Sequence, residues 1–267
     1  MPKLGLIGCG AMGSALAKGI VKHGGVSPDN FYVYDIVPER MEDLVLSLGC
    51  RSGNLEELCR ECDLLILAVK PQDVENVLAS MAGFFRKEQL LVSVAAGIST
   101  RSIEKLLPAG SKVIRLMPNT PCLIGAGAVA VSSGKEVTLE ELEYVESLLT
   151  PLGMVKRVPE KLMEAVTGLS GSGPAFAFYF IEALIDGGVE AGLSRDLATD
   201  LAAQTVLGAA RMLLESGRHP AELKNAVTSP GGTTSAGLLA LEEGAARAAI
   251  IKAVTQAARR AGELKRE

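Results

Sequence analysis

Residues Gly8-Cys9-Gly10-Ala11-Met12-Gly13 form a G-x-G-x-x-G motif. An apolar run over residues 3–7 precedes the motif, and residues 11–23 show the apolar spacing of a helix. A strand, a glycine motif and a helix in this order are typical of a dinucleotide site, because glycine lets the backbone approach a pyrophosphate. The following helix N-terminus adds unpaired N–H groups and a partial positive charge. We therefore expect cofactor contacts from Gly8, Gly10, Ala11, Met12 and Gly13.

The next predicted strand, residues 31–34, ends at Asp35. A carboxylate in this place accepts hydrogen bonds from the adenosine ribose and repels a 2′-phosphate. Asp35 therefore favours NADH over NADPH. Arg40 is nearby and would pair with a 2′-phosphate if the loop turned toward it, so both cofactors stay open.

Strand and helix patterns alternate through the first part of the chain. Further strands are predicted at 63–69, 90–94, 112–116, 128–131 and 154–158, and further helices at 38–48, 54–60, 73–84 and 138–149. This alternation predicts βαβ units and an α/β fold with a Rossmann-type, doubly wound, mostly parallel sheet.

Other strand ends in such a sheet line the same crevice. The turns at 68–71, 95–97 and 115–121 each follow a predicted strand. The small residues of the second turn leave room for a bulky planar ring. We expect cofactor contacts from Ala68, Val69, Lys70, Pro71, Ala95, Ala96 and Gly97.

The pattern changes near Pro159, after which the sequence predicts helices alone. They cover residues 162–169, 173–191, 195–216, 220–228, 234–243 and 245–264. We therefore expect a dinucleotide-binding domain at 1–158 and an all-α domain at 159–267.

Two Gly-rich segments interrupt the helical half. Ser229-Pro-Gly-Gly-Thr-Thr234 opens a predicted helix, so its backbone N–H groups and hydroxyls suit an anion such as a carboxylate. Ser170-Gly-Ser-Gly-Pro174 is better explained as a helix cap and a close-packing turn.

Composition excludes several classes of protein. The chain of 267 residues is 48% hydrophobic and 22% charged, with a net charge of −4, six Phe, four Tyr and no Trp. It has no basic stripe and few aromatic rings for stacking bases, so we expect no nucleic-acid partner. The longest apolar run, residues 174–185, is broken by Glu182 and is too short to span a membrane. We read a protein without a targeting segment, located in the cytoplasm.

Metal sites are disfavoured as well. The two histidines, His23 and His219, cannot form a histidine cluster. Cys59 and Cys62 form a lone C-x-x-C, but no second ligand pair with zinc spacing and no thioredoxin-like surroundings are visible. We expect no metal and interpret these cysteines as incidental.

Several motifs together resemble the pyrroline-5-carboxylate reductase family. They are AVKP at 68–71, AAGI at 95–98, RLMPNTP at 115–121, AVTGLSGSGPA at 165–175 and VTSPGGTTSAGL at 227–238. The last motif is the most specific, whereas many dehydrogenases share the N-terminal glycine motif. The resemblance covers essentially the whole chain.

This resemblance implies a reductase that makes L-proline from 1-pyrroline-5-carboxylate with NADH or NADPH. It implies an α-half that forms a homodimer, with dimers assembling into rings such as a decamer. By the family pattern Asn54 touches the cofactor, Thr234 places a hydroxyl near the ring nitrogen, and Glu160 lies near the substrate amine. The substrate carboxylate is held by Ser229, Gly231, Gly232, Thr233 and Thr234. Asp35 departs from the polar uncharged residue that is common in the family.

Hydride would pass to C5 of the ring imine, and a protonated imine needs no strong general acid.

Other NAD(P)-dependent imine or hydroxyacid dehydrogenases share the architecture. Hydroxyacid enzymes typically use a Lys or His in the second domain. This chain has no Lys between Lys161 and Lys224, and its His219 falls in a polar turn. A non-catalytic NAD(P)-binding protein would have no reason to keep the 229–234 segment.

Overall fold

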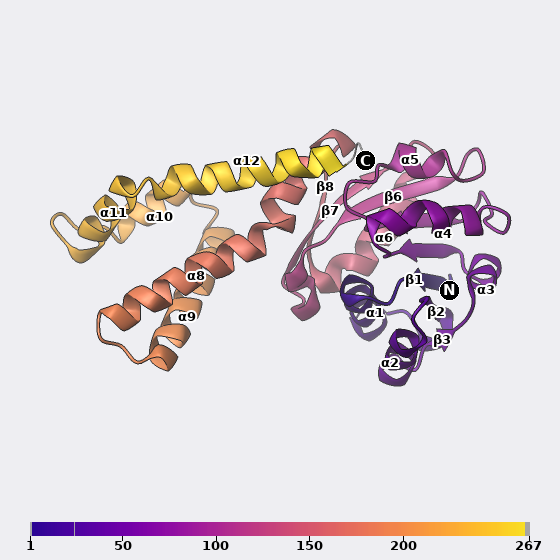
Figure 1. The fold of residues 1–267 in the computed structure, drawn as a ribbon, viewed down its shortest axis with the longest axis horizontal. Coiled ribbons are helices and arrows are strands. Elements are labelled where there is room, and N and C mark those ends of the chain that lie inside the picture. Colours follow the sequence, from indigo (N-terminus) through magenta and orange to yellow (C-terminus); the bar gives the residue numbers. More distant parts are fainter. Residues whose placement is uncertain (1, 24, 265–267) are drawn as a thin grey trace. The chain divides into compact units, whose positions relative to one another are not determined.

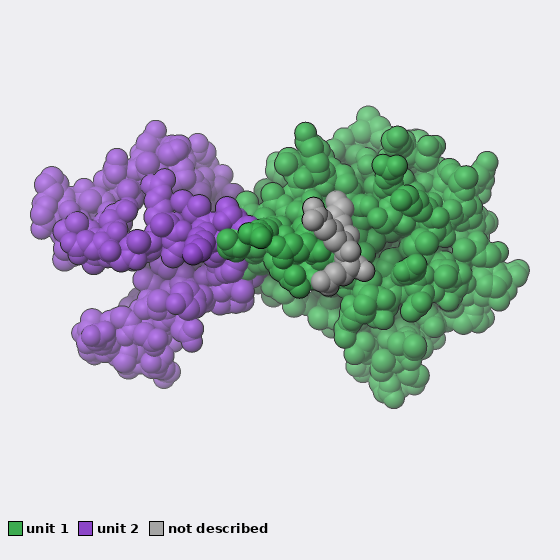
Figure 2. Space-filling model, turned by 45° about the horizontal axis from the view of Figure 1, so that its top comes forward, with its two compact units in different colours: residues 1–172, 256–267 green, residues 173–255 purple. Residues whose placement is uncertain are grey.

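The computed structural model describes residues 2–23 and 25–264. The chain forms two compact units, residues 1–172 with 256–267 and residues 173–255 (Figure 2). Residues 159–172, which we expected in the helical domain, pack with the first unit. They do so because Arg115 and Asn119 bind them: Arg115 pairs with Glu160, and the Asn119 amide donates to the Ser170 carbonyl.

The first unit is built on one eight-stranded sheet (Figure 1). Its strands in chain order are β1 Leu4–Ile7, β2 Phe31–Tyr34, β3 Arg51–Ser52, β4 Leu64–Leu67, β5 Leu90–Ser93, β6 Lys112–Met117, β7 Gly127–Ser133 and β8 Gly153–Arg157. The spatial order β3-β2-β1-β4-β5-β6-β7-β8 reverses direction at β1. All neighbours pair in parallel except β6 and β7, so the predicted doubly wound, mostly parallel sheet is confirmed.

Helices cover both faces of this sheet. They are α1 Ala11–His23, α2 Pro38–Leu48, α3 Leu55–Glu61, α4 Val74–Met81, α5 Thr100–Glu104 and α6 Leu139–Leu149, followed by α7 Met163–Val166. One core cluster holds the apolar faces of α1, α2 and α6, and the other those of α3, α4 and α5. The strands feed both clusters by alternation, since Leu64 and Ile66 face the first and Leu65 and Leu67 the second.

Local signals fix most helix starts. Asn54 and Glu57 exchange hydrogen bonds at the start of α3, and Thr138 and Glu141 do the same at α6. Pro38 opens α2, which ends at Gly49 with φ +69°. The predicted helices at these places are confirmed to within about two residues.

Four features were not predicted. The two-residue strand β3 and the short helix α5 were absent from the prediction, and β7 runs antiparallel to β6. In addition, a π-helical turn over Thr167–Gly171 follows α7 where one continuous helix was expected at 162–169.

The second unit contains helices alone. They are α8 Gly173–Glu190, α9 Arg195–Ser216, α10 Pro220–Ala226, α11 Thr233–Glu243 and the start of α12, Ala246–Leu264. Helices α8 and α9 lie side by side (Figure 1), where Gly188 lets α8 approach Ala198 of α9. Within the described residues, no helix is long and apolar enough to cross a membrane.

A polar contact inside the first unit holds the end of α3. The Gln89 side chain is 1% exposed and donates to the carbonyls of Cys59 (2.8 Å) and Cys62. Arg86 donates to the same two carbonyls from outside. The two carbonyls lie at the C-terminal end of α3, just before β4. Carbonyls at a helix C-terminus have no hydrogen-bond partner within the helix, so they need donors from elsewhere in the chain.

We expect Gln89→Ala to lower the free energy of unfolding by about 1–3 kcal/mol, because it removes two buried hydrogen bonds and leaves both carbonyls with Arg86 as their side-chain donor. Urea unfolding at a fixed protein concentration measures this change. The exposed Gln72→Ala is the matched control and should change stability by less than about 0.5 kcal/mol. Equal losses in the two variants would contradict the assignment.

Candidate cofactor and substrate sites

The carboxyl ends of β1, β2 and β4 meet where the strand order reverses. The Gly8 N–H donates to the Tyr34 carbonyl at the end of β2, and the Ala68 N–H donates to the Ile7 carbonyl of β1, both at 2.8 Å. Crevices at such reversal points are where doubly wound sheets bind ligands. The structure thus brings the glycine motif, Asp35 and the 68–71 turn to one edge of the sheet.

Each glycine of the motif has its own geometry. Gly8 has φ +100°, and a Cβ there would lie 2.6 Å from the Ala68 carbonyl oxygen. A Cβ at Gly13 would collide with the Gly8 carbonyl, so this glycine lets α1 sit tightly on its own loop. A Cβ at Gly10 would meet no described atom within 4 Å. Gly10 therefore borders open space, as an approach to a pyrophosphate requires.

Gly10 immediately precedes the start of α1. Ala11 and Met12 belong to its first turn, whose N–H groups have no partner within the helix. This turn has no acidic residue, and Lys22 and His23 lie in the last turn. A phosphate would therefore meet a helix N-terminus with no competing carboxylate in that turn.

Asp35 is hydrogen-bonded to the backbone of the glycine motif. Its carboxylate is almost fully buried and accepts the Cys9 N–H at 2.6 Å and the Val37 N–H at 2.9 Å. Arg40 lies 3.9 Å from Oδ1 with its side chain half exposed. Asp35 thus anchors the glycine loop at the position where we expected it to meet a ribose.

Asn54 follows β3 and is exposed. Its side-chain oxygen accepts the Glu57 N–H at 2.9 Å, so this atom caps α3. A cofactor contact by Asn54 stays a prediction.

The two expected turns differ in exposure. Lys70 and Pro71 are exposed, and Pro71 opens a 3₁₀ turn over Pro71–Asp73. Ala95 is buried, and Gly97 has φ +77°, which only glycine adopts easily. The Val94 N–H donates to the Leu67 carbonyl. This bond places the 95–97 turn beside the 68–71 turn.

A buried ion cluster around Arg115 was not predicted from the sequence. Arg115 of β6 is 1% exposed, and its guanidinium lies 2.9 Å from Glu160 and 3.7 Å from Glu164. Glu160 Oε1 also accepts the Thr100 N–H at 3.4 Å. An arginine inside an apolar strand, as in KVIRLM, is the signal that could have indicated a buried carboxylate partner.

The end of the 115–121 segment is held separately. Asn119 Nδ2 donates to the Ser170 carbonyl at 3.1 Å, and its Oδ1 accepts the Ala128 N–H at 2.9 Å. One amide thus joins the loop after β6 to β7 and to the π-helical turn.

In the second unit, the 229–234 segment forms the start of α11. Gly231 has φ +66°, the Gly232 N–H bonds to the Ser229 carbonyl, and Gly232 is the N-cap of the helix. No side chain caps this helix start, whose first turn carries Thr233 and Thr234. The predicted arrangement of glycines and hydroxyls at a helix N-terminus is therefore present. Binding of a carboxylate there stays a prediction.

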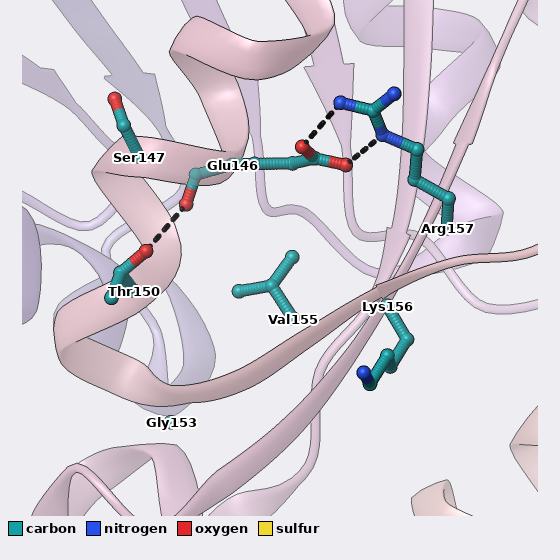
Figure 3. Close-up of a pocket in the computed structure, with 7 residues that line it drawn as sticks. All are labelled: Glu146, Ser147, Thr150, Gly153, Val155, Lys156 and Arg157. Carbon is teal, nitrogen blue, oxygen red and sulfur yellow. Dashed lines mark hydrogen bonds and ion pairs between the residues drawn. The ribbon is translucent and has the colours of Figure 1, made fainter.

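A polar hollow of about 470 Å³ lies elsewhere in the first unit, between the end of α6 and the edge strand β8 (Figure 3). Glu146 extends from α6 toward β8, where Arg157 donates to both of its carboxylate oxygens, while Lys156 extends to the other side of the strand. Because the cation nearest the carboxylate is already paired, we assign this hollow no ligand.

All five cysteines are buried and free. Burial raises the pKa of Cys9 and of Cys62 to about 12 and that of Cys59 to about 11. Burial suppresses the thiolate that redox chemistry and metal ligation need. Cys59 and Cys62 thus behave as apolar core residues at the end of α3.

Comparisons with known proteins agree with this geometry. The family model described as pyrroline-5-carboxylate reductase dimerisation matches residues 160–264, and the one described as NADP oxidoreductase coenzyme F420-dependent matches residues 3–97. The pyrroline-5-carboxylate reductase of Methanosarcina acetivorans is 47% identical over 98% of this chain and 97% of its own length. The chain belongs to the pyrroline-5-carboxylate reductase family.

Solved structures of this family superpose on nearly the whole chain. The Plasmodium falciparum pyrroline carboxylate reductase, with NADP bound, has a TM-score of 0.90 at 34% identity and covers 99% of this chain and 98% of its own. The Coxiella burnetii enzyme reaches 0.91 at 34% identity, covering 98% of each chain. Membership of the family makes this chain an NAD(P)-dependent oxidoreductase.

We expect the thiols to react with DTNB at pH 8 only after unfolding, when all five become accessible. The folded state holds Cys9, Cys59 and Cys62 protonated, whereas the unfolded chain releases these protons near pH ~8.5. Their contribution to stability is therefore complete below that pH and is lost as pH rises toward 11–12. Rapid modification of Cys59 or Cys62 in the folded protein would instead indicate a redox pair.

Proposed function

We propose that the chain reduces 1-pyrroline-5-carboxylate to L-proline, the last step of proline biosynthesis. The observation that carries this proposal is that one chain combines a dinucleotide crevice with the uncapped, hydroxyl-bearing helix start of α11. Relatives so named match the chain over 98% of its length. The assay is oxidation of NADH or NADPH on addition of the imine, and no oxidation with either would refute the function.

The residues divide the work. The glycine motif and the N-terminus of α1 hold the pyrophosphate, and the 68–71 and 95–97 turns border the nicotinamide. Ser229, Gly231, Gly232, Thr233 and Thr234 hold the substrate carboxylate. A bound nicotinamide cofactor supplies the hydride, which adds to C5 of the ring imine. A nitrogen that is already protonated makes the imine electrophilic, so positioning supplies most of the catalysis.

One histidine caps a helix and the other is exposed at a helix end, which supports an imine over a hydroxyacid substrate. His219 Nδ1 accepts the Ala221 N–H as the N-cap of α10, and His23 lies exposed at the end of α1. No Lys occurs between Lys161 and Lys224. A hydroxyacid dehydrogenase would need such a group as its acid and base.

The second unit favours a homodimer. Among the described residues, α8, α10 and α11 bury none of their side chains in this chain. Phe178, Tyr179 and Leu214 are each more than 60% exposed. Apolar exposure on this scale marks an interface. The family's dimerisation model covers the same helices, so we propose a second copy of the chain as their partner. Assembly into rings such as a decamer, and cytoplasmic location, stay predictions.

The first prediction from this function concerns Thr234. Thr234→Ala should lower kcat by about 10²-fold, because the hydroxyl orients the ring nitrogen or relays a proton to it, and leave NADH binding nearly intact. Thr234→Ser should restore most of the turnover. Thr228→Ala, which removes a hydroxyl that bonds to the Lys224 carbonyl just before the segment, is the control. Unchanged turnover in Thr234→Ala would refute the role.

A second prediction concerns the preference for NADH over NADPH. We propose NADH as the preferred donor, because the buried Asp35 carboxylate would repel a 2′-phosphate. Asp35→Asn should raise the ratio of kcat/KM for NADPH to that for NADH by about tenfold, equivalent to ~1.4 kcal/mol. Asn keeps one acceptor for the Cys9 N–H. Asp29→Asn removes a carboxylate that pairs with Arg51 on the surface and should leave the ratio unchanged. A wild-type preference for NADPH, unaltered by Asp35→Asn, would contradict this proposal.

A further inference from the structure

Burying the charged groups of the Arg115 cluster costs free energy, so the presence of the cluster needs an explanation. A guanidinium that is 1% exposed loses nearly all its hydration, and a buried ion pair is on average no more stabilising than apolar residues of the same volume. The Arg115 Nε and Glu160 Oε2 are buried with no hydrogen-bond partner among the described residues. The cluster is thus incompletely satisfied, which favours a positional role over a contribution to stability.

The contact between Glu160 and Thr100 indicates which part of the chain the cluster holds in place. Glu160 Oε1 accepts the N–H of Thr100, the first residue of α5, after Ser99 has capped that helix. The 95–97 turn stands immediately before this cap, and Gly97 lets it reverse with φ +77°. Glu160 therefore ties β6, through Arg115, to the backbone that closes the 95–97 turn.

The same geometry argues against contact between Glu160 and a substrate. One carboxylate oxygen is occupied by Arg115 and Thr100, and the other is closed to solvent. A substrate amine could reach either oxygen only if the bridge opened. Glu164 also faces Arg115, at 3.7 Å. Burial, and next the charge of Glu160, raises the pKa of the neighbouring Glu104.

We propose that Glu160, held by Arg115, is a positioning residue that fixes the 95–97 turn against the nicotinamide ring and does not bind the imine. This inference rests on the proposed function only in taking that turn as the wall of the nicotinamide site. It replaces the contact with the substrate amine that the family pattern suggested for Glu160.

The test compares Glu160→Ala and Glu160→Gln with Glu141→Ala in the full-length protein. Glu141 is a matched control, because it pairs with Lys112 of the same strand β6 at 2.6 Å and also caps α6. Two readouts are taken: the fluorescence of bound NADH without any imine, and steady-state kinetics. Thermal unfolding of each variant checks that folding is retained.

We expect Glu160→Ala to shift the emission of bound NADH toward that of free NADH and to lower kcat about tenfold. The NADH Kd should change less than about threefold, because the glycine motif still holds the pyrophosphate, and the imine KM should stay unchanged. Glu160→Gln keeps an acceptor for the Thr100 N–H and should restore most of both signals. Glu141→Ala should match wild type in emission and kcat, even if it melts earlier.

Two results would overturn the proposal. A raised imine KM in both Glu160 variants, with wild-type emission and kcat, would make the carboxylate a substrate ligand. Equal changes in Glu160→Ala and Glu141→Ala would make the bridge merely structural. Failure of the proposed function is distinguishable, since it appears as absent turnover in the wild type, and the emission comparison then still decides for or against positioning.

Discussion

The close approach of two backbones at Gly8 is the contact on which the rest of the first unit depends. A side chain at Gly8 would stand 2.6 Å from the Ala68 carbonyl, so β1 and β4 can end side by side only with glycine there. Their pairing opens the crevice and puts the 68–71 turn beside the glycine motif. Asp35 then fastens the loop through the Cys9 N–H. The nucleotide crevice is therefore a consequence of sheet packing as much as of cofactor chemistry.

Features governed by local chemistry could be predicted from the sequence. Helix α1 begins and ends where its glycine motif and apolar spacing indicate, and α3 and α6 begin after the residues that cap them. The capping pairs lie three residues apart in the chain, so their geometry is set within one turn. The gathering of Gly8, Asp35 and Ala68 could also be predicted, because parallel strands in βαβ order bring their carboxyl ends to one edge.

Features that depend on residues far apart in the chain could not be predicted from the sequence. Arg115 and Glu160 are forty-five positions apart, and nothing beside either residue indicates the other. β3 has only two residues, and its pairing with β2 defines it better than any pattern of its own. The 159–172 segment has helical spacing, as we expected, yet it belongs to the sheet unit because Arg115 and Asn119 bind it. Spacing predicts the type of an element, whereas long-range polar contacts decide what it packs against.

The chain also shows how a reductase can work with few acid and base side chains. Its His219 serves as a helix cap, its thiols are buried, and its buried arginine is bound to carboxylates. What remains at the two candidate sites is mainly backbone, at the N-terminus of α1, the 95–97 turn and the start of α11, together with the hydroxyls that α11 carries in its first turn. Backbone N–H groups cannot transfer a proton at neutral pH, but they hold anions and planar rings in fixed places. Such a site suits a reaction whose electrophile arrives already protonated, because accurate placement is then the main requirement.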